Sequence, residues 1–181
     1  MKLKLFIAVD LDEPARDLVA VAIQKLQSAG IDARFEPREK WHSTLAFLGW
    51  VEDERYAAVR EALAIAAARC RPFDLRLDCV GAFPSTARPR VIWIGGRDAQ
   101  PGYDAVSKGV RVAYEALGFA FERDAVPHVT VCRLKSFRGP LPEVALPTVA
   151  IAKVDSLTLY QSIPAGRTTR YALREKIRLG L

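Results

Sequence analysis

The chain has 181 residues, half of them apolar, which is long enough for one well-buried core or for two small lobes that share one. Its three cysteines are odd in number and lack C-x-x-C spacing, which argues against a disulfide scaffold and against a zinc site. A net charge of +6, with 19 Arg among 27 basic residues, is compatible with a phosphate-bearing partner, although a solvated Arg-rich surface is the simpler explanation.

Apolar runs and their periodicity predict the elements in chain order. We expect a strand at 6–9, a helix at 13–29 followed by Gly30, a strand at 41–50, a helix at 52–69, strands at 73–80 and 91–94, a helix at 103–117 followed by Gly118, and strands at 126–134, 150–160 and 171–179. No apolar run approaches the ~20 residues of a membrane helix, and the N-terminus lacks the shape of a signal peptide. We therefore expect a cytoplasmic protein with no membrane contact.

The only two histidines of the chain open the same short pattern. The tetrads are H-S-T-L at 42–45 and H-V-T-V at 128–131. Thr occupies only seven of the 181 positions, so chance does not readily place one two residues after both histidines. Each tetrad lies in an expected strand, where residues i and i+2 point to the same face. Each histidine therefore shares a face with a hydroxyl group.

The order strand, helix, His-x-Thr strand occurs twice. The two histidines are 86 residues apart, and the same offset maps Phe6 onto Ile92 and the first helix onto the third. We interpret this as an internal duplication within one bilobal domain, residues 1–181. Two lobes that face each other across a pseudo-twofold axis would bring the two histidines into one groove.

Two histidines in one groove are suited to acid–base chemistry near neutral pH. One can activate water while the other protonates a leaving oxygen, and each Thr can donate a hydrogen bond to a phosphoryl oxygen. Such a site can hydrolyse a phosphodiester, and a strained cyclic phosphate especially well. The alternative is that both are core histidines. A metal site is disfavoured because neither tetrad carries Asp or Glu. We expect neither a metal nor a cofactor.

The likeness of this sequence to a known family begins at the tetrads and extends over nearly the full chain. The matching blocks are LFIAVDL at 5–11, RFEP and WHSTLAFLG within 34–49, PRVIWIG at 89–95, PHVTVCR at 127–133, LYQS at 159–162 and RYAL at 170–173. They resemble the RNA 2′,3′-cyclic phosphodiesterases, also called 2′-5′ RNA ligases, of the 2H phosphoesterase superfamily. The resemblance implies an α+β bilobal fold, with two antiparallel sheets around a central groove and helices outside.

The resemblance also implies a reaction and the residues that carry it. The substrate would be an RNA with a 2′,3′-cyclic phosphate end, or a small cyclic nucleotide, and the product a 2′-phosphate. His42 would be the proton donor to the leaving 3′ oxygen, and His128 the proton acceptor that activates water. Thr44, Thr130 and Arg133 would bind the phosphate.

Two further expectations leave alternatives open. A base could stack on Phe6 or Phe47, although core packing is the favoured role for both. The same site could join RNA ends through a 2′-5′ bond, or the protein could be a binding module that grips RNA ends without turnover. Paired histidines and threonines in both halves argue against the binding module, because binding alone needs no acid and base. We expect the protein to be a monomer.

Overall fold

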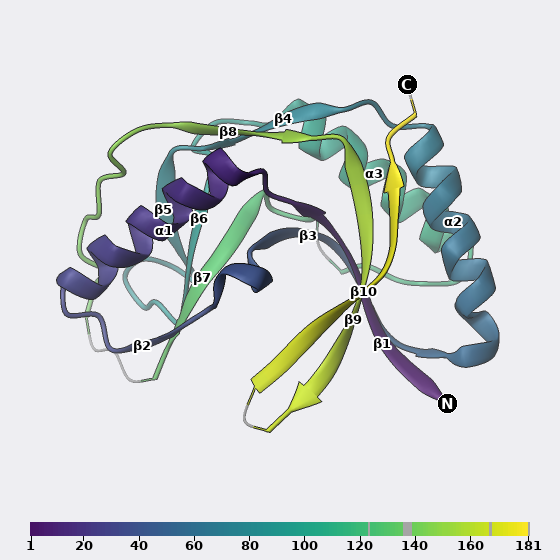
Figure 1. The fold of residues 1–181 in the computed structure, drawn as a ribbon, viewed down its shortest axis with the longest axis horizontal. Coiled ribbons are helices and arrows are strands. Elements are labelled where there is room, and N and C mark those ends of the chain that lie inside the picture. Colours follow the sequence, from purple (N-terminus) through teal and green to yellow (C-terminus); the bar gives the residue numbers. More distant parts are fainter. Residues whose placement is uncertain (123, 136–138, 167, 181) are drawn as a thin grey trace.

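The computed structural model describes residues 1–122, 124–135, 139–166 and 168–180 of an α+β protein (Figure 1). The helices are α1 (Glu13–Ser28), α2 (Tyr56–Ala68) and α3 (Pro101–Glu115), with short 3-10 turns at Arg38–Lys40 and Asp53–Arg55. The strands are β1 (Lys2–Asp10), β2 (Ala33–Phe35), β3 (His42–Glu52), β4 (Phe73–Leu77), β5 (Cys79–Phe83), β6 (Val91–Gly95), β7 (His128–Leu134), β8 (Ala150–Val154), β9 (Ser156–Ala165) and β10 (Thr168–Arg178). Within these described residues, no helix is long and apolar enough to cross a membrane.

The main sheet is antiparallel and consists of two halves. Its strand order is β10–β9–β1–β3–β7–β6–β5, with β2 added beside β7, while β4 and β8 form a separate pair. The halves β10–β9–β1–β3 and β7–β6–β5 meet where β3 pairs with β7, and that pairing consists of Ser43 and Val129 alone. In Figure 1 the two halves diverge from this joint. The two histidine-bearing strands are therefore the ones that connect the halves.

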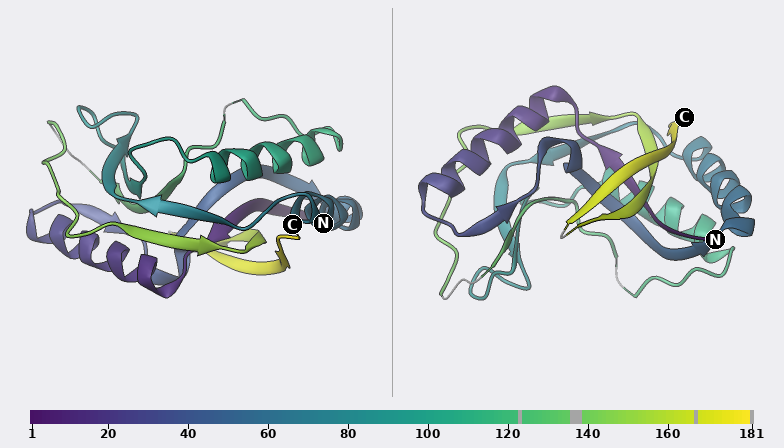
Figure 2. Two further views of the ribbon diagram at one scale, coloured as in Figure 1. Left: turned by 90° about the horizontal axis from the view of Figure 1, so that it is seen from above. Right: turned by 60° about the horizontal axis from the view of Figure 1, so that its bottom comes forward.

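The helices cover the outer side of the strands. In α1 the apolar residues recur at helical spacing and are buried, and the Asp12 carboxylate caps the helix by accepting the Ala15 N–H at 3.1 Å. Gly30 follows with a φ of 74°, a left-handed conformation that favours glycine, as predicted. Figure 2 shows α1 and α3 on opposite sides of the β4–β8 pair. This pair is thus sandwiched between two helices.

Two predicted strands are each two strands in the structure. The run 73–80 changes sheet at Asp78, whose carboxylate accepts hydrogen bonds from the Arg76 side chain at 2.6 Å and the Arg97 N–H at 2.9 Å. The run 150–160 changes sheet at Asp155, whose carbonyl accepts the Leu179 N–H at 2.8 Å. Both predictions were wrong because the chain is extended on each side of the break, so the sequence pattern does not mark it.

The internal repeat is present, with one change of register. Thr44 pairs with Ala8, whereas Thr130 pairs with Trp93. Relative to the histidines, β1 therefore maps onto β6 with an offset of 85 residues rather than the predicted 86. The position beside the tetrad threonine is therefore occupied by the small side chain of Ala8 in the first half and by the indole of Trp93 in the second half.

Candidate active site

The two tetrads meet at the joint between the halves of the sheet. Ser43 pairs with Val129 across the joint, and the Ser43 hydroxyl oxygen accepts the His128 backbone N–H at 3.3 Å. His128 lies close enough that its positive charge would contribute to lowering the pKa of His42. The structure thus brings the two histidines together, as the duplication predicts.

Both histidine rings are held in the same way. In each, Nδ1 lies 2.7 Å from the carbonyl oxygen of the residue two positions earlier, Lys40 for His42 and Val126 for His128. A carbonyl can only accept, so this geometry assigns the proton of the neutral ring to Nδ1 and leaves Nε2 as a hydrogen-bond acceptor. Nε2 of His42 contacts Oγ1 of Thr44 at 3.1 Å, as the same-face argument predicts. Each ring is therefore anchored at one nitrogen and available for proton transfer at the other.

Burial disfavours the protonated form of both histidines in the free protein. It lowers the pKa of His42 from 6.5 to about 4, against the smaller opposing effect of the Lys40 carbonyl. Burial also lowers the pKa of His128. A phosphate anion between the rings would shift both pKa values upward, because a nearby negative charge favours the protonated imidazole.

Aromatic side chains surround the His42 ring. The ring centroids of Phe6, Tyr171 and Tyr160 lie 5.1, 5.3 and 5.9 Å from it. Phe6 is only 2% exposed, so the expectation that it stacks on a base is wrong, and packing beside the histidine is its role. Phe47, by contrast, is 69% exposed and offers an open ring face.

A half-buried carboxylate, that of Asp10, lies beside His42 in the β1–β3 pairing. Asp10 accepts hydrogen bonds from the Tyr160 hydroxyl at 2.7 Å, the Thr158 hydroxyl at 2.9 Å and the Lys176 ammonium at 2.9 Å. Burial by itself would raise the pKa of Asp10, but these three hydrogen bonds hold it below its ordinary value. The carboxylate therefore remains charged, and it favours protonation of His42.

Trp93 and Phe83 border the His128 ring. The ring centroids lie 6.2 and 4.9 Å from the imidazole. The indole fits because Gly81 and Gly95 lie against it, where any Cβ atom would overlap or crowd its ring. Its Nε1 is buried and has no hydrogen-bond partner among the described residues. The two histidines are thus both framed by aromatic rings, but by rings from different strands.

A buried tyrosine connects the two tetrads. The Tyr103 hydroxyl donates to the Thr44 carbonyl at 2.7 Å, lies 3.4 Å from the Val126 carbonyl and accepts from the Ser43 hydroxyl at 3.3 Å. Burial raises the pKa of Tyr103 to about 12, so the hydroxyl remains a donor. Since Ser43 in turn accepts the His128 N–H, one hydrogen-bonded chain crosses the joint.

Arg133 lies on the same face of β7 as Thr130. A register shift in the β6–β7 pairing makes this possible although the two residues are three positions apart. Nε of Arg133 lies 3.3 Å from the carboxylate of Glu36, which also pairs with Lys40 at 3.6 Å and Arg34 at 3.9 Å. The Arg133 side chain is 48% exposed, so part of its guanidinium faces solvent beside the tetrads.

A cavity of about 540 Å³ opens beside the tetrads. It is lined by Thr44, Leu45, Ala46, Phe47, Phe83, Arg111, Ala120, Phe121, Glu122, Asp124, Ala125, Val126 and His128. Polar groups of both tetrads thus adjoin an aromatic hollow. In the part of the chain that the structure describes, no three His, Cys, Asp or Glu side chains gather closely enough to hold a metal ion.

Comparison with known proteins shows the family. A family model described as LigT-like phosphoesterase matches residues 9–93. The RNA 2′,3′-cyclic phosphodiesterase of Methanothermobacter thermautotrophicus is 31% identical over 175 residues, which cover 92% of this chain and 94% of that protein. The chain belongs to the LigT-like phosphoesterases. The enzyme of the same name from Archaeoglobus fulgidus is 35% identical over 143 residues, 79% of this chain and 77% of that protein.

Solved structures of other proteins have the same fold. E. coli LigT in its apo form superposes with a TM-score of 0.80 at 27% identity, over 99% of both chains. TT0787 of Thermus thermophilus gives a TM-score of 0.82 at 27% identity, over 98% of both chains. These likenesses confirm the predicted α+β fold and the family resemblance.

The sequence reasoning missed several groups that this LigT-like phosphoesterase places beside its histidines. They are Asp10, Glu36, Phe83, Trp93, Tyr103, Phe121, Tyr160 and Tyr171. Half of them belong to expected strands or helices whose partners were unknown, so their neighbours were not predictable. Asp10 alone carried a signal, because a carboxylate ends an otherwise apolar run.

The lowered pKa values predict an acidic optimum for catalysis. Acid–base catalysis by the pair requires one neutral and one protonated histidine, so kcat/KM should be bell-shaped. Because burial lowers both pKa values from 6.5, the protonated partner is lost as the pH rises through the lowered values. The maximum of kcat/KM should therefore lie below pH 6.5. A steady-state pH series measures this, and a flat profile across the range in which histidine titrates would contradict it.

Proposed function

We propose that this LigT-like phosphoesterase hydrolyses the 2′,3′-cyclic phosphate at RNA ends, and of small cyclic nucleotides, to a 2′-phosphate. The observation that carries the proposal is the pair of histidines at one joint, both anchored through Nδ1 to a carbonyl at 2.7 Å. The relatives named RNA 2′,3′-cyclic phosphodiesterase support the substrate. The mechanism uses neither a metal nor a cofactor.

His128 acts as the base and His42 as the acid. His128 takes a proton from water at Nε2, the water oxygen attacks phosphorus, the bond from phosphorus to O3′ breaks, and His42 gives its Nε2 proton to O3′. The acid and base roles follow the family resemblance. Burial lowers the pKa of both histidines, and the Asp10 charge opposes that lowering at His42. The Val126 carbonyl, which accepts a hydrogen bond from the Nδ1–H of His128, stabilises the imidazolium that forms at His128.

Three side chains bind the phosphate in this proposal. Thr44 and Thr130 donate hydroxyl hydrogen bonds to the nonbridging oxygens, which gain charge in the transition state. Arg133 supplies a positive charge from the same strand face as Thr130, and Glu36 orients its guanidinium. The proposed site is complete within one chain, so it needs no residue from a second copy.

The substrate's terminal nucleoside occupies the cavity beside the tetrads. At about 540 Å³ the cavity lies within the usual range for small-molecule sites. Its exposed Phe47 offers a face on which any base can stack, which fits recognition of RNA ends without reading their sequence. A cytoplasmic location is supported by three free cysteines, as expected in a reducing compartment.

The test is to incubate the purified protein in EDTA with a short RNA that ends in a 2′,3′-cyclic phosphate and to resolve the products by phosphorus NMR. A 2′-phosphate establishes the reaction, its regiochemistry and its independence of added metal. A 3′-phosphate would reverse which oxygen His42 protonates. A 2′-5′ linked product with added 5′-hydroxyl RNA would favour end joining. Binding without turnover would replace the proposal with an RNA-end binding module.

A further inference from the structure

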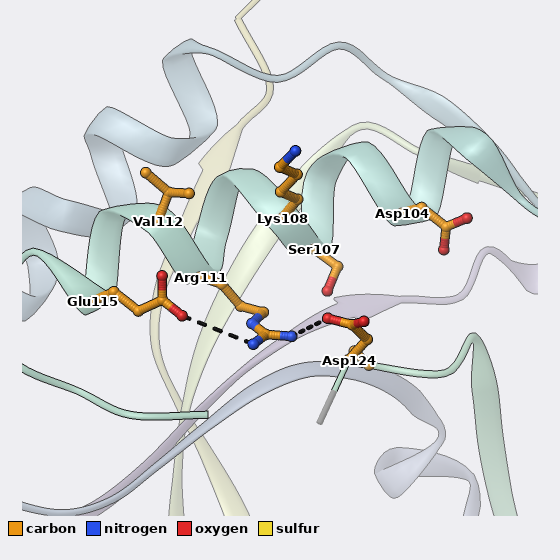
Figure 3. Close-up of a pocket in the computed structure, with 8 residues that line it drawn as sticks. Asp104, Ser107, Lys108, Arg111, Val112, Glu115 and Asp124 are labelled. Carbon is orange, nitrogen blue, oxygen red and sulfur yellow. Dashed lines mark hydrogen bonds and ion pairs between the residues drawn. The ribbon is translucent and has the colours of Figure 1, made fainter. Parts of the chain in front are cut away.

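Arg111 of α3 lies between two cavities. One is the nucleoside cavity of the proposed function, and the other, of about 640 Å³, lies along α3 and is shown in Figure 3. Three residues line both of them: Arg111, Asp124 and Ala125. These residues therefore form the partition between the catalytic side of the molecule and the surface of α3.

The Arg111 guanidinium holds the chain that leads into the second tetrad. It forms an ion pair with Asp124, donates from Nη2 to the Phe121 carbonyl at 3.3 Å and lies 5.6 Å from the centroid of the Phe121 ring. Nη2 also lies 3.8 Å from Glu115, one helical turn along α3. Figure 3 shows the guanidinium between these two carboxylates. The Arg111 side chain is 18% exposed, whereas the side chain of its partner Asp124 is 97% exposed.

The residues that Arg111 holds are a wall of the nucleoside cavity. Residues 120–122 and 124–126 line the cavity, yet they belong to no helix or strand. A wall without its own ladder of backbone hydrogen bonds needs side-chain contacts to keep one position. If the wall is held in one position before the ligand binds, binding loses no conformational entropy in ordering the wall.

We propose that Arg111 is a positioning residue that fixes this wall and so determines the affinity of the site for the nucleoside of the substrate. The proposal rests on the function proposed above. It concerns binding rather than the proton transfers, because the Val126 carbonyl, which anchors His128, is approached separately by the Tyr103 hydroxyl. Loss of Arg111 would therefore loosen the wall and leave His128 in place.

The test compares two substrates in the wild type and in Arg111→Ala. The first is adenosine 2′,3′-cyclic phosphate, and the second is methyl ribofuranoside 2,3-cyclic phosphate, which has the same reacting group but no base. Arg111→Ala should raise KM for the nucleotide about tenfold and leave kcat nearly unchanged. This pattern is expected when a substitution weakens binding of the ground state and of the transition state equally. KM for the base-free substrate should not change.

Matched variants separate positioning from general stability. Glu115→Gln removes a carboxylate that contacts Arg111 but not the wall, and it should leave both KM values unchanged. Arg111→Lys keeps a charge for Asp124 but loses the planar contact with the Phe121 ring, so its KM should be intermediate. Equal changes with both substrates, or a loss of kcat that follows the melting temperature, would overturn the proposal.

A failure of the proposed function has a different signature. If the wild type hydrolyses neither substrate, the function fails, and the affinity for 2′-AMP by calorimetry then tests Arg111 without turnover. Weaker binding by Arg111→Ala than by the wild type would support the positioning role. Equal binding would overturn it.

Discussion

Replacing either histidine with alanine should lower turnover by about 10²–10⁴-fold, the scale on which a general acid or base contributes to catalysis. Each ring transfers its proton through Nε2, and alanine offers no group that could replace it. The loss should be in kcat, because the threonines and Arg133 that bind the phosphate remain. Steady-state rates on a 2′,3′-cyclic nucleotide measure the effect.

Asparagine at the same positions is the matched control for structure. Its side-chain amide can donate to the Lys40 or Val126 carbonyl, as Nδ1 does, but it cannot transfer a proton near neutral pH. His42→Asn and His128→Asn should therefore be as inactive as the alanine variants and should melt closer to the wild type. If activity in all four variants instead follows their melting temperatures, the histidines are core residues and the two-histidine mechanism is wrong.

The sequence predicted which residues meet at the site better than it predicted how their side chains are held in place. His42 and Thr44 were predictable as neighbours because the period of a strand is a local property of the backbone. The meeting of the two tetrads followed from the repeat. The anchoring of each ring by the carbonyl two residues earlier did not, because it depends on how the chain turns into the strand, and composition carries no signal for that.

Long-range contacts account for what could not be predicted. Asp10 accepts hydrogen bonds from β9 and β10, nearly the whole chain away, and no local pattern identifies such partners. The breaks at Asp78 and Asp155 were missed for a related reason: each is a change of sheet, which is a tertiary event inside a continuously extended stretch of chain. Phe6 and Phe47 could not be told apart from the sequence, because burial depends on the aromatic residues that close over Phe6 and leave Phe47 exposed.

Substitution of two tyrosines of α3 can distinguish an effect on stability from an effect on catalysis. Tyr103 and Tyr114 are both fully buried, and each donates its hydroxyl to a main-chain carbonyl, of Thr44 at 2.7 Å and of Val59 at 2.8 Å. Tyr→Phe at either position leaves a buried carbonyl without its donor. Each variant should therefore lose about 1–2 kcal/mol of unfolding free energy, measured by denaturant titration.

Only Tyr103→Phe should also impair catalysis. Its hydroxyl connects the Thr44 carbonyl to Ser43 and, through Ser43, to the His128 backbone, so its loss lets the two tetrads shift relative to each other. A displacement of reacting groups by a fraction of an ångström is costly, and we expect turnover to fall about tenfold or more. Tyr114→Phe, equally destabilised but bonded to α2, should keep kcat within the error of the wild type. Equal turnover in the two variants would mean that the hydroxyl chain across the joint stabilises the fold and does not position the histidines.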